Sequence, residues 1–185
     1  DPGRIMKKRE INIFAFSAVI AALLLGLCAS HVLAAEAIEV TKARVDELPG
    51  GKEADGIIGD FVLRSDMIEA VISHKAPLRR ANMSTFYGDD GATPGCLYDL
   101  TLRGKNNDQI TIFAPLEQRG EVSYVRIVPD GEVAANEAAV ETVVTAALGK
   151  GIFKQYRYIV TDGVQGVTVL TTLRNEGKVP VSLKM

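Results

Sequence analysis

The sequence has little of what most enzyme active sites are built from. Among its 185 residues there are no Trp, two His and two Cys, and aromatic residues make up 6% of the chain. So few His and Cys disfavour a zinc site, which needs three or four His, Cys or carboxylate ligands, and they disfavour a Ser-His-Asp triad. The HExxH, GxSxG, GxGxxG and P-loop motifs are also missing. No catalytic residue and no cofactor are therefore predicted.

The chain also lacks a strong charge of either sign. Lys and Arg total 21 against 23 Asp and Glu, which gives a formal net charge of −2. Beyond the first nine residues the basic side chains form no cluster of the size that binds polyanions. Nucleic acid and anionic membrane surfaces are therefore not expected partners.

One long hydrophobic run is present, near the amino terminus. The first five residues lie upstream of the first Met, and a signal peptide is predicted over residues 6–34. It has three basic residues, an apolar stretch over 11–28, and the small residues Ala34 and Ala35 as cleavage positions. A retained membrane anchor is the alternative, because the apolar stretch approaches the roughly 18 to 20 residues of a spanning helix. The pattern favours a secreted or periplasmic protein with no membrane contact after cleavage.

Only one cysteine and one histidine follow the signal segment. Cys28 belongs to the apolar stretch, so Cys96 has no internal disulfide partner and is expected to be a small buried residue. His74 lies in a polar stretch and is expected to be solvated. Asp55 and Asp60 could pair as acid and base, but two acids in a loop are expected to be solvated as well.

Residues 35–185 read as strands separated by turns, which predicts a single domain. The expected fold is all-β and mostly antiparallel, a sandwich or partial supersandwich that is truncated at the carboxyl end. A hairpin is predicted over 59–72 with its turn at Ser65-Asp66. The other expected strands lie in 38–45, 96–104, 109–117 paired with 121–131, 156–160 paired with 167–173, and a last one from Val179.

Residues 134–149 fit two structures. Val140, Val143, Val144 and Leu148 follow a helical spacing, which indicates one short helix. The same stretch is rich in β-branched residues and lies among strands, which indicates a strand.

The polar segment 74–95 and the strand after it contain the candidate binding residues. Arg79, Arg80, Phe86, Tyr87 and Tyr98 could form a sugar-binding platform, with ring faces stacking on the ligand and arginines holding its hydroxyls. A carbohydrate or another cell-envelope ligand is the expected partner.

The same segment holds one candidate metal site. Asp89 and Asp90 could bind Ca²⁺ through loop oxygens, although the twelve-residue EF-hand register is absent.

Two groups of strand residues resemble the amino-terminal region of large secreted bacterial proteins of planctomycete and myxobacterial type, which opens a galactose-mutarotase-like supersandwich. The matching positions are Gly59, Asp60, Phe61, Leu63, Asp66, Ile68, Val71 and Ile72, then Tyr158, Thr171, Leu173, Asn175, Gly177, Pro180, Val181 and Leu183. The resemblance implies a fold and no active site, because the catalytic His and acid of a mutarotase have no counterpart. It also implies a strand over 138–147.

Together these observations predict an exported, non-catalytic β module, structural or ligand-binding, within a larger cell-envelope or secreted protein. A carboxyl-terminal domain of the same protein is a second expected partner, because a hydrolase or regulatory domain often follows the region that the chain resembles. The alternative is a fragment of a carbohydrate-active enzyme related to mutarotases or lyases.

Overall fold

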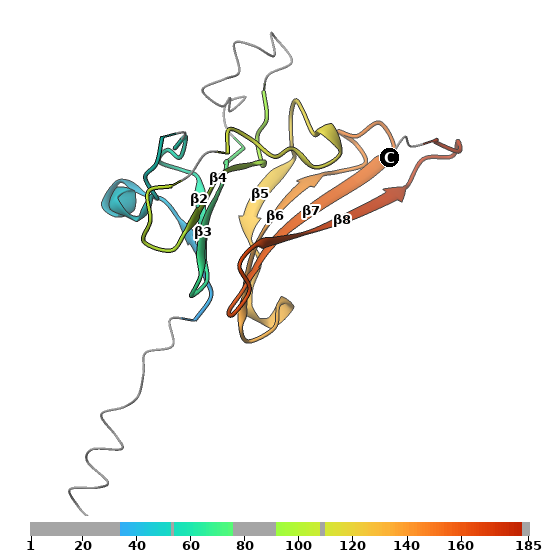
Figure 1. Cartoon of the computed structure of the whole chain (residues 1–185). Coiled ribbons are helices and arrows are strands. Elements are labelled where there is room, and N and C mark those ends of the chain that lie inside the picture. The colour runs from blue at the N-terminus through green and yellow to red at the C-terminus, as the bar shows by residue number, and fades with distance from the viewer. Residues whose placement is uncertain (1–33, 53, 76–91, 108–109, 183–185) are drawn as a thin grey trace, which may run out of the picture. The chain divides into compact units, whose positions relative to one another are not determined.

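A computed structural model describes residues 34–52, 54–75, 92–107 and 110–182, all within one compact unit, Leu33–Met185. Its strands form two four-stranded antiparallel sheets, in each of which the spatial order follows the sequence (Figure 1). The first sheet contains β1 (Glu36–Glu39), β2 (Phe61–Arg64), β3 (Ile68–Ile72) and β4 (Leu97–Leu102). The second contains β5 (Tyr124–Ile127), β6 (Glu137–Val144), β7 (Ile152–Thr161) and β8 (Val167–Asn175). The prediction of a mostly antiparallel all-β fold is confirmed.

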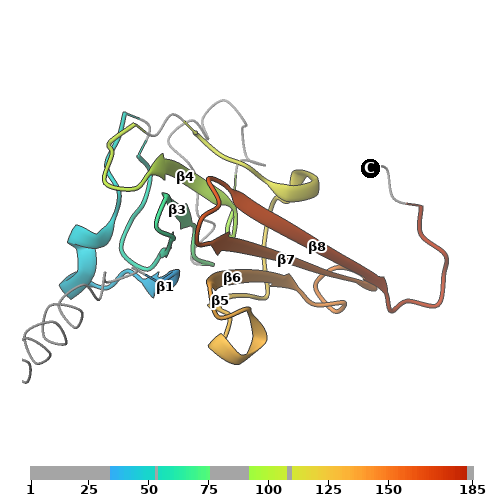
Figure 2. The same ribbon diagram turned by 60° about the horizontal axis from the view of Figure 1, so that its bottom comes forward.

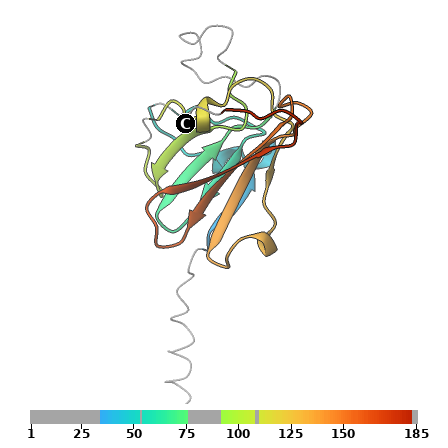
Figure 3. The ribbon, with the colours of Figure 1, turned by 90° about the vertical axis from the view of Figure 1, so that its right-hand side faces the viewer.

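The main core lies between the two sheets, which face each other (Figures 1 and 3). Alternate residues of each strand point to the same face, so the sheets contribute period-two rows of apolar side chains. The buried residues of this cluster are Phe61, Leu63, Ile68, Ala70, Ile72 and Leu97 from the first sheet, and Ala138, Val140, Tyr156, Tyr158 and Val160 from the second.

The outer face of the first sheet is covered as well. Val62 and Val71 point away from the main core and pack with Ile38, Val40 and Leu48. The chain reaches this face through a 3₁₀ helix, Lys42–Glu47, so only the first part of the strand predicted over 38–45 is extended.

An arginine of β2 holds the 3₁₀ helix in place. The Arg64 side chain donates to Glu69 Oε1 at 2.7 Å, and it also donates to the side chain and the carbonyl of Glu47. Desolvation works against the charge of this arginine, but the contacts with Glu47 and Glu69 outweigh it and raise the Arg64 pKa.

The hairpin predicted over 59–72 is confirmed, with β2 and β3 joined at Ser65. The Ser65 amide donates to the Ile68 carbonyl at 3.0 Å, and the Ser65 hydroxyl accepts from the amides of Met67 and Ile68. A serine that binds the backbone two and three residues ahead is a local turn former.

A β-bulge explains why apolar residues fall out of phase in β4. The pairing between β3 and β4 shifts between Val71 and Ile72, so that Leu97 lies opposite Ile72 while Asp99 lies opposite Val71. The extra residue, Tyr98, lets Leu97 and Leu100 share one face although they are three residues apart.

Residues 137–144 form the central strand β6, which decides between the two structures predicted for 134–149. This strand pairs with β5 on one side and with all eight of its residues against β7 on the other. Seven of those eight residues are buried, so both faces of β6 are covered. A strand covered on both faces has a nearly continuous apolar sequence in place of an alternating one. The strand expected from the family resemblance is confirmed, and the helix indicated by the spacing of Val140, Val143 and Val144 is wrong.

Two other predicted strands are absent from the described residues. Residues 110–117 contain a single bridge, between Phe113 and Leu97, followed by a 3₁₀ helix at Pro115–Glu117; β5 pairs with β6 instead. Leu116 and Glu117 have positive φ, which extended strands do not adopt. The segment 176–182 also forms no strand, and Val179 is 71% exposed there.

Leu63→Ala should cost far more stability than Val169→Ala. Leu63 is fully buried between the sheets, whereas Val169 only packs partly against the same core. Truncating a buried leucine leaves a cavity and costs about 2 to 5 kcal/mol. Removing two half-exposed methyl groups costs about 1 kcal/mol. Urea unfolding of the two variants would measure the difference, and equal losses would contradict this description of the core.

Candidate functional site

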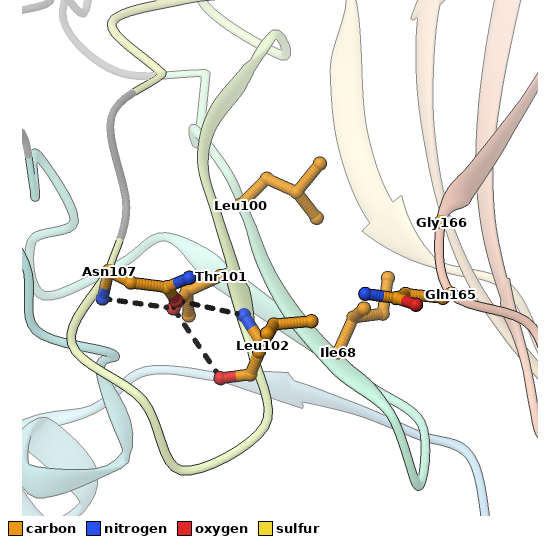
Figure 4. A pocket seen from close by; sticks show the side chains of 7 residues that line it. All are labelled: Ile68, Leu100, Thr101, Leu102, Asn107, Gln165 and Gly166. Carbon is orange, nitrogen blue, oxygen red and sulfur yellow. Dashed lines mark hydrogen bonds between the residues drawn. The ribbon is translucent and has the colours of Figure 1, made fainter.

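The candidate ligand site is a hollow at one end of the sandwich, with a volume of about 190 Å³ (Figure 4). One wall comes from the start of β3 and the end of β4, and the other from the turn between β7 and β8. The lining residues are Ile68, Leu100, Thr101, Leu102, Asn107, Gln165 and Gly166.

Two aspartates tie the walls of this hollow together. The Asp66 amide donates to Asp162 Oδ1 at 3.2 Å, and the Gly163 amide donates to Asp66 Oδ1 at 2.8 Å. The β2–β3 turn is thereby held against the β7–β8 turn by two reciprocal hydrogen bonds. These two bonds between backbone amides and carboxylates set the position of Gln165 relative to Ile68.

The floor of the hollow is fixed by a side-chain network. Asn107 Oδ1 accepts from the Leu102 backbone amide at 3.2 Å and from the Thr101 hydroxyl (Figure 4). The backbone N–H of Asn107 donates in turn to Thr101 Oγ1 at 3.4 Å. The Gln165 side-chain amide, by contrast, has no hydrogen-bond partner in the part of the chain that the structure describes, and it points toward Ile68 (Figure 4).

The chemistry of the lining suits a small neutral ligand. Amide groups both donate and accept hydrogen bonds, and the aliphatic side chains of Ile68, Leu100 and Leu102 provide an apolar surface beside them. Sites for drug-sized molecules usually measure roughly 300 to 1,000 Å³. At about 190 Å³, this hollow is large enough for one sugar-sized group and too small for a large cofactor.

This site is not predictable from the sequence. Asn107 and Gln165 belong to turns that were recognised only as strand connections, and neither lies in a motif. Both line one hollow because the start of β3, the end of β4 and the turn between β7 and β8 lie at the same side of the sandwich (Figure 4).

The predicted sugar platform loses one member and is otherwise outside the described residues. Tyr98 is fully buried, and its hydroxyl lies 2.7 Å from Thr93 Oγ1. A ring with no exposed face cannot stack on a ligand, so Tyr98 is a core residue. Arg79, Arg80, Phe86 and Tyr87, and the predicted Ca²⁺ ligands Asp89 and Asp90, lie in residues 76–91, which the structure does not describe.

Asp55, Asp60 and His74 are not solvated, contrary to the expectation. Asp60 is 0% exposed and Asp55 is 7% exposed. The Asp60 carboxylate accepts from the backbone amides of Ile57 and His74, each at 2.9 Å. His74 lies 3.9 Å from Asp60 Oδ1 through Nε2, with 19% of its side chain exposed. Buried polar groups are nearly always hydrogen-bonded. Asp60 provides an acceptor for one amide before β2 and for another after β3.

Asp99 has a role of the same kind that the sequence did not reveal. It is 0% exposed, and its two oxygens accept from the amides of Asp55 and Gly56 at 2.8 and 2.9 Å. It therefore fixes the loop before β2 to the outer face of the first sheet. In the sequence Asp99 was visible only as an interruption of the apolar pattern.

The loop before β4 connects the two sheets through one carbonyl. The Gly95 oxygen accepts from the Thr142 hydroxyl of β6 at 2.7 Å and from the Tyr158 hydroxyl of β7 at 2.9 Å. Gly95 has φ +70, and a Cβ there would lie 2.3 Å from Thr142 Cγ2. Only glycine fits this approach.

Cys96 is buried beside this connection, as expected. Its sulfur faces the carbonyls of Pro94 and Gln118, and burial raises the pKa of the thiol to about 12. Burial also raises the pKa of Tyr156 to about 12 and that of Tyr158 well above its usual value. A thiol protonated at neutral pH is a poor nucleophile, so this cluster is part of the packing.

Stability should fall at alkaline pH, in part through Cys96. Its folded pKa of about 12 lies above the unfolded value of about 8.5, so the fold favours the protonated thiol. The contribution is complete below the unfolded pKa and is lost as the pH rises toward the folded one. Between pH 7 and pH 10 the loss should reach about 2 kcal/mol.

Urea unfolding at pH 7, 8.5 and 10 would measure this loss. Cys96→Ala removes the thiol and should remove its share of the pH dependence, leaving that of the tyrosines, which begin to ionise near pH 10 in the unfolded chain. An unchanged slope in Cys96→Ala would show that the thiol does not titrate as described.

A buried carboxylate lies on the outward row of β6. Glu141 is 0% exposed and accepts from Arg126 and Gln155, both at 2.7 Å, and from Arg157 at 3.1 Å. Burial by itself would raise the Glu141 pKa, but the hydrogen bonds and charges of the two arginines outweigh it, and the pKa is lowered. This acid is therefore ionised, and its oxygens are bound by three side chains from the two neighbouring strands, β5 and β7.

Two further features, a cluster of metal-ligating side chains and a helix able to span a membrane, are absent from the described ranges. Within them, no three His, Cys, Asp or Glu side chains come together in a way that could hold a metal. In the same residues no helix is both long and apolar enough to cross a membrane.

Comparison with known proteins adds no family: no family model, no curated protein and no solved structure matches this chain. The fold and the site define an antiparallel β-sandwich module with a small amide-lined hollow at one end.

Proposed function

We propose that this chain is an exported, non-catalytic β module, structural or ligand-binding, within a larger cell-envelope or secreted protein. The observation that carries the proposal is the use made of its buried polar groups. Asp60, Asp99 and Glu141 all bind backbone amides or neighbouring side chains of the sandwich. Catalytic acids need a free position for substrate or solvent, whereas these carboxylates hold strands and loops together.

A contact at the start of the fold bears on which of the two predicted cleavage positions is used. The Ala35 nitrogen lies 3.1 Å from Asp162 Oδ2, and β1 begins one residue later. Cleavage after Ala34 would convert this nitrogen to an ammonium group, and a charge-assisted hydrogen bond is stronger than a neutral one. Cleavage after Ala35 would remove the donor. Of the two predicted positions, we therefore favour the one after Ala34.

The proposed ligand is a carbohydrate, bound as a single sugar unit in the hollow. Gln165 offers a donor and an acceptor with no competing partner among the described residues. The aliphatic side chains that line the hollow can cover the apolar face of a sugar ring. The resemblance to a galactose-mutarotase-like region agrees with a sugar-binding ancestry and is itself part of the proposal.

One experiment tests both parts of this function. The full sequence is expressed in a bacterial host, the exported form is weighed by mass spectrometry, and its binding to a panel of soluble glycans is measured. Export with cleavage after Ala34 is expected, together with weak binding that Gln165→Ala abolishes. Lys178→Ala, an exposed change beyond the end of β8 opposite to the hollow, should leave the binding intact. Protein retained in the membrane fraction at full length would contradict export, and binding unaffected by Gln165→Ala would contradict this site.

The enzyme alternative predicts a different result for the same samples, namely turnover of a sugar. Asp60 and His74 form the acid–histidine pair that a mutarotase-like or lyase-like reaction would require, at 3.9 Å. Both Asp60 oxygens already accept backbone amides, so we expect no sugar turnover above the buffer rate. Turnover that disappears in both Asp60→Asn and His74→Gln would replace our proposal with the alternative.

A further inference from the structure

The strand β8 has a long edge without a partner. It is the last strand in the order β5-β6-β7-β8 and pairs with β7 along its whole length, from Val167 opposite Val160 to Asn175 opposite Ile152 (Figures 1 and 2). On its other side no strand in the described ranges pairs with it. Alternate residues along this nine-residue edge therefore present N–H and C=O groups that are available for hydrogen bonding.

The other three edges carry the features that protect edges from pairing. The strand β1 is four residues long and both begins and ends with glutamate. The strand β5 is also four residues long and is followed by Pro129. The strand β4 has the bulge described above and is bridged at Leu97 by Phe113. Short length, charge, proline and bulges are the usual protective devices.

None of these devices occurs in β8. Its pairing with β7 is continuous, it contains no proline, and no charged residue occurs from Val167 to Leu173. Leu170, near its centre, is 54% exposed. A long, regular, uncharged edge of β-branched and apolar residues is the kind that pairs with another strand.

We propose that β8 pairs with β8 of a second copy of this chain, antiparallel, about a two-fold axis at Thr171. A two-fold axis perpendicular to the sheet keeps the same face outward in both copies, so each residue must lie opposite one of the same face. Thr171 is the midpoint of Val167–Asn175, and an axis there pairs all nine residues and joins the two four-stranded sheets into one.

The sequence of β8 is complementary to itself in this arrangement. On the inner face Val169 lies opposite Leu173 of the partner subunit, and on the outer face Leu170 lies opposite Thr172 of the partner subunit. Apolar and threonine pairs across strands are stabilising.

The single charged residue of the strand also fits. Arg174 lies opposite Thr168 of the partner subunit, so no like charges face each other. Within its own chain Arg174 is held 4.1 Å above the Phe153 ring and 3.0 Å from Glu176. This self-complementarity favours a second copy as the occupant of the edge.

Charge substitutions at the proposed axis test the arrangement. Thr171 is exposed, so Thr171→Lys and Thr171→Glu should fold normally, which circular dichroism would verify. In the dimer each change places two like charges directly opposite each other. We expect the wild type to sediment as a dimer, and each variant to dissociate with a constant about tenfold higher or more. An equimolar mixture of the two should regain the dimer, because lysine then faces glutamate.

A control and a register test complete the experiment. Ala135→Lys, an exposed change in the loop before β6, should leave the association unchanged. Thr168→Glu should tighten the dimer, because the new carboxylate faces Arg174 of the partner subunit, and Thr168→Lys should weaken it. A wild type that is monomeric at its highest soluble concentration, or a mixture that associates no better than its components, would overturn the proposal. So would identical effects of Thr168→Glu and Thr168→Lys. These outcomes leave export and ligand binding untouched, since neither depends on β8 pairing.

Discussion

Gly95→Ala is expected to lower the free energy of unfolding by about 4 kcal/mol, close to the whole stability of a small domain. Two effects combine at this position. Alanine at φ +70 is strained by about 1 to 2 kcal/mol. Its Cβ would also lie 2.3 Å from Thr142 Cγ2 and 2.4 Å from Thr142 Oγ1, so the loop must move away from β6. Moving it breaks the two hydrogen bonds that Thr142 and Tyr158 donate to the Gly95 carbonyl.

Two further variants separate these effects in urea unfolding. Gly104 has φ +65 but nothing within 4 Å of an added Cβ, so Gly104→Ala should show the strain alone, about 1 kcal/mol. Thr142→Ala removes the two closest atoms, Cγ2 and Oγ1, and leaves only Thr142 Cβ, at 2.9 Å, so Gly95→Ala should cost less in a Thr142→Ala background. If Gly95→Ala and Gly104→Ala were equally mild, the close approach of the loop to β6 would be wrong.

Glu141→Ala is expected to cost about 3 kcal/mol, at the lower end of the range for breaking a buried ion pair. The carboxylate is fully buried, but Arg126 is 49% exposed and Arg157 is 21% exposed. The stranded guanidinium groups can therefore recover part of their hydration, which moderates the loss. The matched control is Glu137→Ala, four residues earlier on the same face of β6. Glu137 is partly exposed and accepts from the Ala134 amide at 3.2 Å, so its loss should cost well below 1 kcal/mol.

The pH dependence of the same site distinguishes charge from packing. The Glu141 pKa is lowered in the folded state, so its contribution is fully present above the unfolded pKa of about 4.3. It is lost as the pH falls through the folded pKa. Glu141→Gln keeps the size of the side chain and loses the titration, so its stability should fall less steeply between pH 5 and pH 3. Acid unfolding that is identical in the wild type and Glu141→Gln would show that this carboxylate does not carry the expected charge.

The strands that the sequence located correctly are those whose pattern is local. The hairpin at Ser65 and the pair β7–β8 each combine alternating apolar residues with a turn between them, and both partners lie within about twenty residues. Such pairs need no information from the rest of the chain, because the turn brings their residues together directly. The strand β4 was also visible, although its bulge at Tyr98 was not.

The segments that the local pattern left open or assigned wrongly depend on distant partners. Residues 137–144 carry a helical spacing, and only pairing with β5 and β7 on both sides makes the strand more favourable. Residues 110–117 look like a strand, but the edge of β6 is taken by β5, and in the described residues their one strand-like pairing is the bridge between Phe113 and Leu97. Propensity is a weak preference that tertiary pairing overrides.

For the polar residues the sequence could give only their types. It determined by itself that the chain is a mostly antiparallel β protein and that Cys- and His-based chemistry is scarce, because these follow from composition and short-range periodicity. Only the tertiary structure decided that Asp60 and Asp99 are buried and bind backbone amides, and that Tyr98 belongs to the core. It alone also placed Gln165 beside Ile68 in a hollow. The physical reason is that the burial and hydrogen bonding of a side chain depend on which distant strands pack around it. The alternation of residues along one strand does not show which strands those are.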